Sequence, residues 1–268
     1  MTRDTPASPP PVPGGLAAKG LGIVTLVMWL ALSIVLLTQF RTHIANLDLR
    51  DTDDALRLVQ IRDWLGGQSW FDVTQYRVNP PDGGAMHWSR LIDVPVAALI
   101  LLFTPILGAV AAEQAALAFY PLLLIAMMMA MAGRFCQQMG DRDTGLAALL
   151  ILVTCATILN QMVPLRIDHH GVQILLAFGL LFQAIAPPSA RSGAIAGGVF
   201  ALYLSISFEG LPYLAMFGAL FAFDYVRGAD NGRRLAAFAA VFALGSPAIL
   251  AATRGFSALW PVWCDAWS

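Results

Sequence analysis

The sequence predicts an all-α protein, a polytopic transmembrane helical bundle of about seven spans with one long outer loop. Of its 268 residues, 58% are hydrophobic and only 12% are charged, against roughly 25% charged in an average globular chain. The mean hydropathy is +0.68, and the apolar residues come in blocks near the roughly 20 residues that a spanning helix needs. The charges gather in residues 41–93, which hold eight of the 17 acidic and six of the 16 basic residues.

The chain begins with a segment, 1–19, whose Pro, Gly and Ala content predicts a disordered cytoplasmic tail. The first apolar run, 21–40, is longer than a signal-peptide core and no small-residue cleavage site follows it, so we expect a retained helix. We expect residues 20–268 to form one transmembrane domain. After the charged segment, the apolar runs are 94–112, 114–133, 145–161, 172–186, 194–207, 211–226 and 235–252.

The orientation depends on whether 94–112 spans the membrane or lies on its outer surface. If it lies on the surface, eight basic residues of the tail and short loops fall inside and two fall outside; if it spans, four fall inside and six outside. The positive-inside rule favours the first arrangement, and Pro95 and Pro105 disfavour a straight spanning helix. The alternative is an ordinary proline-containing transmembrane helix. The favoured topology places the N-terminus in the cytoplasm, extends the outer loop to 41–112 and turns all four histidines outward.

The outer loop carries a dense carboxylate cluster, Asp51, Asp53 and Asp54, before a short amphipathic helix that we expect to end at Gly66 and Gly67. One Asp would suffice to cap the helix N-terminus, where negative charge is favourable. Three carboxylates within four residues repel one another unless a cation lies among them, and oxygen ligands suit Mg²⁺ or Mn²⁺. Capping and metal binding remain equal alternatives for this cluster.

A second ionisable cluster, Arg166-Ile-Asp-His-His-Gly171, occupies the short outer loop before the run 172–186. Ionisable groups beside a span are costly and are candidates for function. Asp168 with His169 or His170 offers ligands for a metal, and the His pair suits a proton relay equally well. The remaining alternative is an ordinary polar loop at the headgroup level.

Three smaller features complete the outer side. Glu209 lies where the chain turns between two spans, and it is one of only two glutamates in the chain. His87 precedes Trp88, which suits an interfacial anchor at the headgroup level. Residues 79–84, with two prolines and two glycines, predict a turn.

The order of these motifs resembles the membrane half of oligosaccharyltransferase catalytic subunits of the bacterial and archaeal type. These belong to the GT-C superfamily of glycosyltransferases, which use polyprenyl-linked sugars. The resemblance covers about residues 20–250. Residues 53–63 match the family segment that contains its essential Asp, and residues 69–72 match a Trp-Phe-Asp stretch seen in some members. Residues 87–108 match the family segment that lies along the outer membrane surface. Residues 167–170 match the family's second acidic motif, and residues 207–213 match its aromatic-Gly-Tyr turn.

The resemblance implies roles for individual residues. Asp53 and Asp168 would bind the divalent metal, Mg²⁺ or Mn²⁺, with His170 standing where the family has a second acid. Asp53 and Asp54 would be catalytic. The remaining candidates are Arg166 and Arg90 for the donor phosphate, with Asp51, His169, Glu209 and His87 as further site residues.

The resemblance also implies an activity. We expect transfer of a sugar or oligosaccharide from a polyprenyl phosphate or pyrophosphate donor to a protein or glycolipid acceptor. The reaction would take place on the periplasmic side of the inner (plasma) membrane, in contact with membrane lipid. Because family members continue to a second outer loop and a soluble domain, we expect this chain to be the N-terminal part of a longer protein.

Two other functions remain open from the sequence. One is a polytopic transporter or flippase that uses Asp168, His169 and His170 as a proton relay. The other is a structural membrane subunit without catalysis. The formal net charge of −1 gives no indication of nucleic acid as a partner.

Overall fold

The computed structural model describes residues 15–86 and 88–260, and this part of the protein is almost entirely helical, as predicted. Most of the predicted tail, 1–14, lies outside the described residues, and the first helix begins at Gly15. The elements are α1 (Gly15–Asn46), α2 (Thr52–Leu65), β1 (Thr74–Gln75), β2 (Gly84–Ala85), α3 (Asp93–Leu107), α4 (Ala109–Met139), α5 (Arg142–Thr154), α6 (Ala156–Asn160), α7 (His170–Ile185), α8 (Ala190–Ile206), η1 (Phe208–Gly210), α9 (Leu211–Val226), α10 (Arg233–Arg254) and η2 (Phe256–Leu259).

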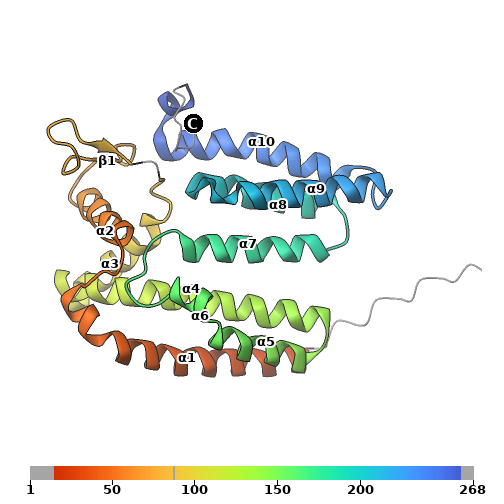
Figure 1. Cartoon of the computed structure of the whole chain (residues 1–268), viewed down its shortest axis with the longest axis horizontal. Coiled ribbons are helices and arrows are strands. Elements are labelled where there is room, and N and C mark those ends of the chain that lie inside the picture. Colours follow the sequence, from red (N-terminus) through yellow and green to blue (C-terminus); the bar gives the residue numbers. More distant parts are fainter. Residues whose placement is uncertain (1–14, 87, 261–268) are drawn as a thin grey trace, which may run out of the picture.

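The long helices lie side by side, with α1, α4, α7, α8 and α10 running in nearly the same direction or its reverse (Figure 1). The helix α2, the hairpin of β1 and β2, and α3 lie at one end, which we call the loop end. The hairpin closes across the turn predicted at 79–84. Every apolar run identified in the sequence lies largely in a helix, and the run 145–161 is divided at Cys155 between α5 and α6.

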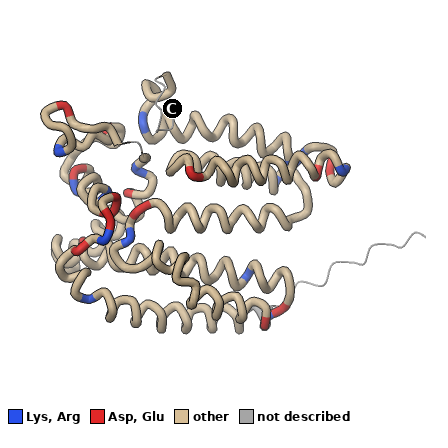
Figure 2. The backbone as a smooth tube through the Cα atoms, viewed as in Figure 1, with Lys and Arg blue, Asp and Glu red and all other residues tan. Residues whose placement is uncertain are grey.

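Three described helices are long and apolar enough to cross a membrane: α1 over Gly20–Asn46, α4 and α10. The helices α3, α7 and α8 are apolar but shorter. On α1 the side chains of Ile23, Val27 and Ile34 are 64%, 58% and 66% exposed. Large exposed apolar surfaces are uncommon on soluble monomers, so these helices are consistent with a membrane protein. Charged residues gather at the ends of the bundle, most densely at the loop end (Figure 2).

The interior contains two main clusters of buried apolar side chains. The first joins α1, α2, α3, α4 and α5 with the start of α7, and its members include Ile61, Leu117 and Leu149. The second joins the remainder of α7 to α8, α9 and α10 and is rich in aromatic rings, among them Phe200 and Phe238. Because α7 contributes to both clusters, it joins them.

The helices α8 and α10 pack with their backbones in close approach. A Cβ atom at Gly193 would lie 2.0 Å from the carbonyl oxygen of Arg234, and one at Gly197 would lie 2.5 Å from that of Phe238. Small residues four positions apart permit this approach between membrane helices. The pair therefore forms a close helix–helix contact that only glycine allows at these two positions.

The capping interpretation of the acidic cluster is confirmed for one of its members. The side chain of Asp51 accepts the backbone N–H of Asp53 at the N-terminus of α2. The helix ends at Leu65, and Gly66 and Gly67 follow it, as predicted.

Candidate functional site

Asp54 connects two segments that are far apart in the sequence. Its buried carboxylate accepts the backbone N–H groups of Ile167 and Asp168 through Oδ1, at 2.9 Å each. Its Oδ2 lies 2.9 Å from Nη1 of Arg166. Burial raises the pKa of the Asp54 carboxyl, although Arg166 and the two N–H groups oppose this. Asp54 therefore fixes the loop before α7 to the first turn of α2.

Arg166 strengthens the same junction. Its Nη1 donates to both Asp51 and Asp54, at 2.9 Å each, and its Nη2 donates to Oε1 of Gln161 at 2.9 Å. The hydrogen bond from Arg166 lowers the pKa of the Asp51 carboxyl. The residue predicted to hold a donor phosphate therefore lies at the site with its charge already shared between two carboxylates.

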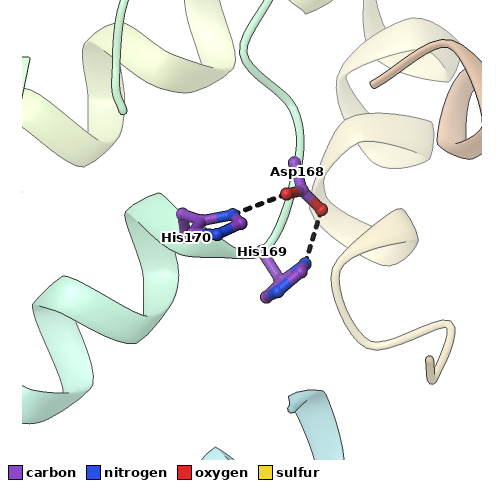
Figure 3. A group of neighbouring side chains, drawn as sticks. All are labelled: Asp168, His169 and His170. Carbon is purple, nitrogen blue, oxygen red and sulfur yellow. Dashed lines mark hydrogen bonds and ion pairs between the residues drawn. The ribbon is translucent and has the colours of Figure 1, made fainter. Parts of the chain in front are cut away.

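Asp168 holds both neighbouring histidines. Its Oδ1 lies 2.5 Å from Nδ1 of His169, and its Oδ2 lies 2.6 Å from Nδ1 of His170 (Figure 3). The two imidazole rings stack with their centroids 4.4 Å apart. One carboxylate therefore uses each of its oxygens to orient one ring.

The charge state of Asp168 follows from these contacts. Burial alone would raise the pKa of its carboxyl, but the hydrogen bonds from His169 and His170 outweigh burial and, with Arg57 nearby, hold the pKa well below its usual range. The hydrogen bond to Asp168 raises the pKa of His170. Asp168 is therefore an ionised acceptor, and both Nδ1 atoms bear protons.

Glu209 approaches the opposite side of the two rings. Its Oε2 lies 3.8 Å from Nε2 of His169 and 4.0 Å from Nε2 of His170. The turn that carries it is well defined, because the hydroxyl of Ser207 accepts the N–H of Glu209. A Cβ at Gly210 would lie 2.3 Å from the ring of Tyr203, so this turn requires glycine there. The His pair lies between two carboxylates, one buried and one 60% exposed.

A buried layer behind Asp168 was not predicted from the sequence. Arg57 donates from Nη1 to Asp93 at 2.9 Å, and its Nη2 lies 3.6 Å from Asp168. Its guanidinium lies over the ring of Trp88 at 4.9 Å from the centroid. The signal was present in the sequence, because Arg57 follows Asp54 by three positions and so shares its face of α2.

The structure places two other predicted residues, Asp53 and Arg90, away from the His pair. Asp53 is partly exposed and its side chain makes no hydrogen bond or ion pair within residues 15–86 and 88–260. The buried guanidinium of Arg90 donates to the carbonyls of Trp70 and Asp72 and so organises the loop after α2, away from the His pair. His87 lies outside the described residues.

A cavity of about 440 Å³ lies beside the His pair, between α6, α7 and the turn from α8 to α9. His170 and Glu209 line it together with Gln161, Gln173, Tyr203 and Tyr213. The Nε2 of Gln173 is buried and has no hydrogen-bond partner among the described residues. Amide and phenol groups in a small concave site offer polar contacts to a ligand.

Asp168, His169 and His170 each offer a ligand atom within 4.8 Å of the others, so these three residues could hold a metal ion. Imidazole nitrogen and carboxylate oxygen are both common donors to divalent metals in proteins. No protein-family model and no curated protein matches the chain.

Proposed function

We propose that the protein is a membrane glycosyltransferase that moves a sugar or oligosaccharide from a polyprenyl phosphate or pyrophosphate donor to a protein or glycolipid acceptor. The supporting observation is a convergence at the loop end. Three segments distant in the sequence meet there: the start of α2, the loop before α7 and the turn after α8. The cavity of about 440 Å³ opens beside the group they form.

The proposed topology has seven spans: α1, α4, α5 continued by α6, α7, α8, α9 and α10. The helix α3 stays on the outer surface in this topology, because the basic residues of the short loops then lie mostly inside. Pro105 within the helix also disfavours a straight span. In this topology the N-terminus is cytoplasmic and the loop end is periplasmic, in the inner (plasma) membrane.

The ionisable groups gathered around the His pair would suit a divalent metal, for which the sequence predicts Mg²⁺ or Mn²⁺. A bound metal would offset the charge that develops on the leaving phosphate. The protein's own residues would supply the other charged groups that the reaction needs. Arg166 would provide positive charge beside the His pair, and the exposed carboxylate of Asp51 at the N-terminus of α2 would orient the acceptor.

The test is transfer of labelled sugar from a polyprenyl-linked donor in membranes that contain the complete protein. We expect Asp168→Asn to lower the rate by at least about 100-fold, because one change releases both histidines. Glu113→Gln is the matched control, since Glu113 pairs with Arg62 away from the His pair. Transfer by Asp168→Asn within a few-fold of the parent would exclude the proposed site.

One observation favours a second function, a transporter or flippase with a proton relay. The stacked His pair between Asp168 and Glu209 forms a chain of groups that can pass a proton from one carboxylate towards the other. A relay would require a proton gradient and no metal. Sugar transfer that persists when the gradient is collapsed, and that stops with a chelator, would separate the two functions in favour of the transferase.

A further inference from the structure

We propose that the metal binds on the Nε2 side of the histidines, held by His169, His170 and Glu209, and that Asp168 positions the two rings without touching the metal. This assignment rests on the proposed metal-dependent function, but it concerns binding alone. The carboxylate ligand of the metal is then Glu209, in place of Asp168 and Asp53, which were the ligands predicted from the sequence.

The Nδ1 side of both rings is already used. The two Nδ1 atoms lie 2.5 and 2.6 Å from separate oxygens of Asp168, and distances this short belong to strong, charge-assisted hydrogen bonds. With Nδ1 protonated, a neutral imidazole presents its lone pair at Nε2. A carboxylate that accepts Nδ1–H and so directs Nε2 to a metal is the common arrangement around metal-binding histidines.

On the Nε2 side, Glu209 lies near the distance from each ring that a shared ion requires. Distances of 3.8 and 4.0 Å from Oε2 of Glu209 are too long for hydrogen bonds. A tetrahedral ion with bonds of about 2.1 Å separates its ligand atoms by about 3.4 Å. The observed gaps exceed this by about half an ångström, a change that rotation of the 60% exposed Glu209 side chain can supply.

The position of the cavity completes the arrangement. His170 and Glu209 both line the cavity of about 440 Å³, so an ion held between them has one side open towards that space. Three protein ligands with an open position characterise catalytic rather than structural metal sites.

The ligand set also selects the kind of metal. Two imidazole nitrogens with one carboxylate suit Zn²⁺, Co²⁺ or Mn²⁺, whereas Mg²⁺ takes oxygen ligands almost exclusively. We therefore expect a transition metal to bind tightly and Mg²⁺ to compete poorly. This differs from the oxygen-rich site that the acidic cluster of α2 would offer.

The test is Co²⁺ titration of the purified full chain in detergent, after removal of metals with a chelator, followed by visible d–d absorption. We expect one Co²⁺ per chain and little competition from excess Mg²⁺. Glu209→Gln should weaken Co²⁺ binding by at least about 100-fold, because it removes a ligand. Asp168→Asn should weaken binding by about 10- to 100-fold and alter the absorption bands, because Asp168 orients the histidine ligands through hydrogen bonds. Glu113→Gln and Asp53→Asn are controls that should leave the affinity unchanged.

Absence of Co²⁺ binding by the parent would overturn the assignment, and so would a Glu209→Gln variant with parental affinity. A loss of binding in Asp53→Asn as large as in Glu209→Gln would also overturn it. Thermal melts of the metal-free variants establish that each is folded, so a binding loss is not a folding loss. The titration contains no sugar donor, so binding without transfer would refute the glycosyltransferase function alone, and transfer without this binding would refute the ligand assignment alone.

Discussion

The neighbouring residues Asp53 and Asp54 should differ sharply in what they contribute to stability. Asp54 is 0% exposed and makes three contacts of 2.9 Å, two with backbone N–H groups and one with Arg166. Asp53 makes no side-chain contact of this kind within the described residues. Substitution of each by Asn keeps the side-chain volume and removes the charge, so the pair forms a matched comparison.

The magnitude follows from the contacts that are lost. Removing one partner of a buried ion pair costs about 3–5 kcal/mol, but in Asp54→Asn the amide oxygen still accepts the two N–H groups and Arg166 keeps Asp51. We therefore expect Asp54→Asn to lower the free energy of unfolding by about 2–4 kcal/mol. For Asp53→Asn we expect a change within about 0.5 kcal/mol, as at other partly exposed positions.

The assay is unfolding in mixed micelles with increasing denaturing detergent, followed by circular dichroism. Hydrogen exchange at the amides of Ile167 and Asp168 gives a local check, because these two N–H groups donate to Asp54. If the two Asn variants unfold within 0.5 kcal/mol of one another, Asp54 is not the residue that fixes the loop before α7.

Three further outcomes follow from the structure. Gly193→Ala should destabilise the protein by about 1–3 kcal/mol, because the new Cβ would overpack against α10. Gly198→Ala should be tolerated, because the nearest neighbour of its Cβ would be 3.9 Å away. Thermal melts of the two variants test this difference. In the metal-free protein the hydrogen bond to Asp168 raises the pKa of His170, so the ion pair stabilises the folded state fully at a pH below the unfolded-state pKa of about 6.5. The melting temperature should therefore fall as the pH rises through the higher folded-state pKa. The variant His170→Gln should show a weaker dependence of melting temperature on pH. Arg57→Lys should lower the free energy of unfolding by about 2–4 kcal/mol, because an ammonium cannot reach Asp93 and Asp168 together; unchanged unfolding would contradict the role of this buried layer.

The helices were predictable because their signal is local. An apolar run of 15 or more residues must bury its backbone polar groups within a helix, whether it faces protein or lipid. The division at Cys155 was not predicted. The break between the runs 94–112 and 114–133 was predicted, but it lies earlier than expected, at Gly108, which has a φ of 77°. The hairpin turn was predictable from the prolines and glycines of 79–84.

The site was predicted as a set of residues but not as a set of contacts. Alignment with the resembling family favoured Asp53, whereas the helical face that holds Leu58 and Ile61 includes Asp54, four and seven positions earlier. One residue along a helix turns a side chain by about 100°, which decides between contact and solvent. Glu209 could be singled out only as a rare glutamate, because its approach to His169 requires the packing of α7 against α8.

The lengths of the helices have a consequence for the surrounding lipid. The apolar run 21–40 of α1 has 20 residues and is about 30 Å long, whereas α9, with 16 residues, is about 24 Å long. At the loop end α7 and α8 stop short of α1 and α4 (Figure 1). In the proposed topology the apolar run of α1 matches a bilayer of about 30 Å, whereas α9 is shorter than that bilayer and would impose a hydrophobic mismatch on the lipid beside it.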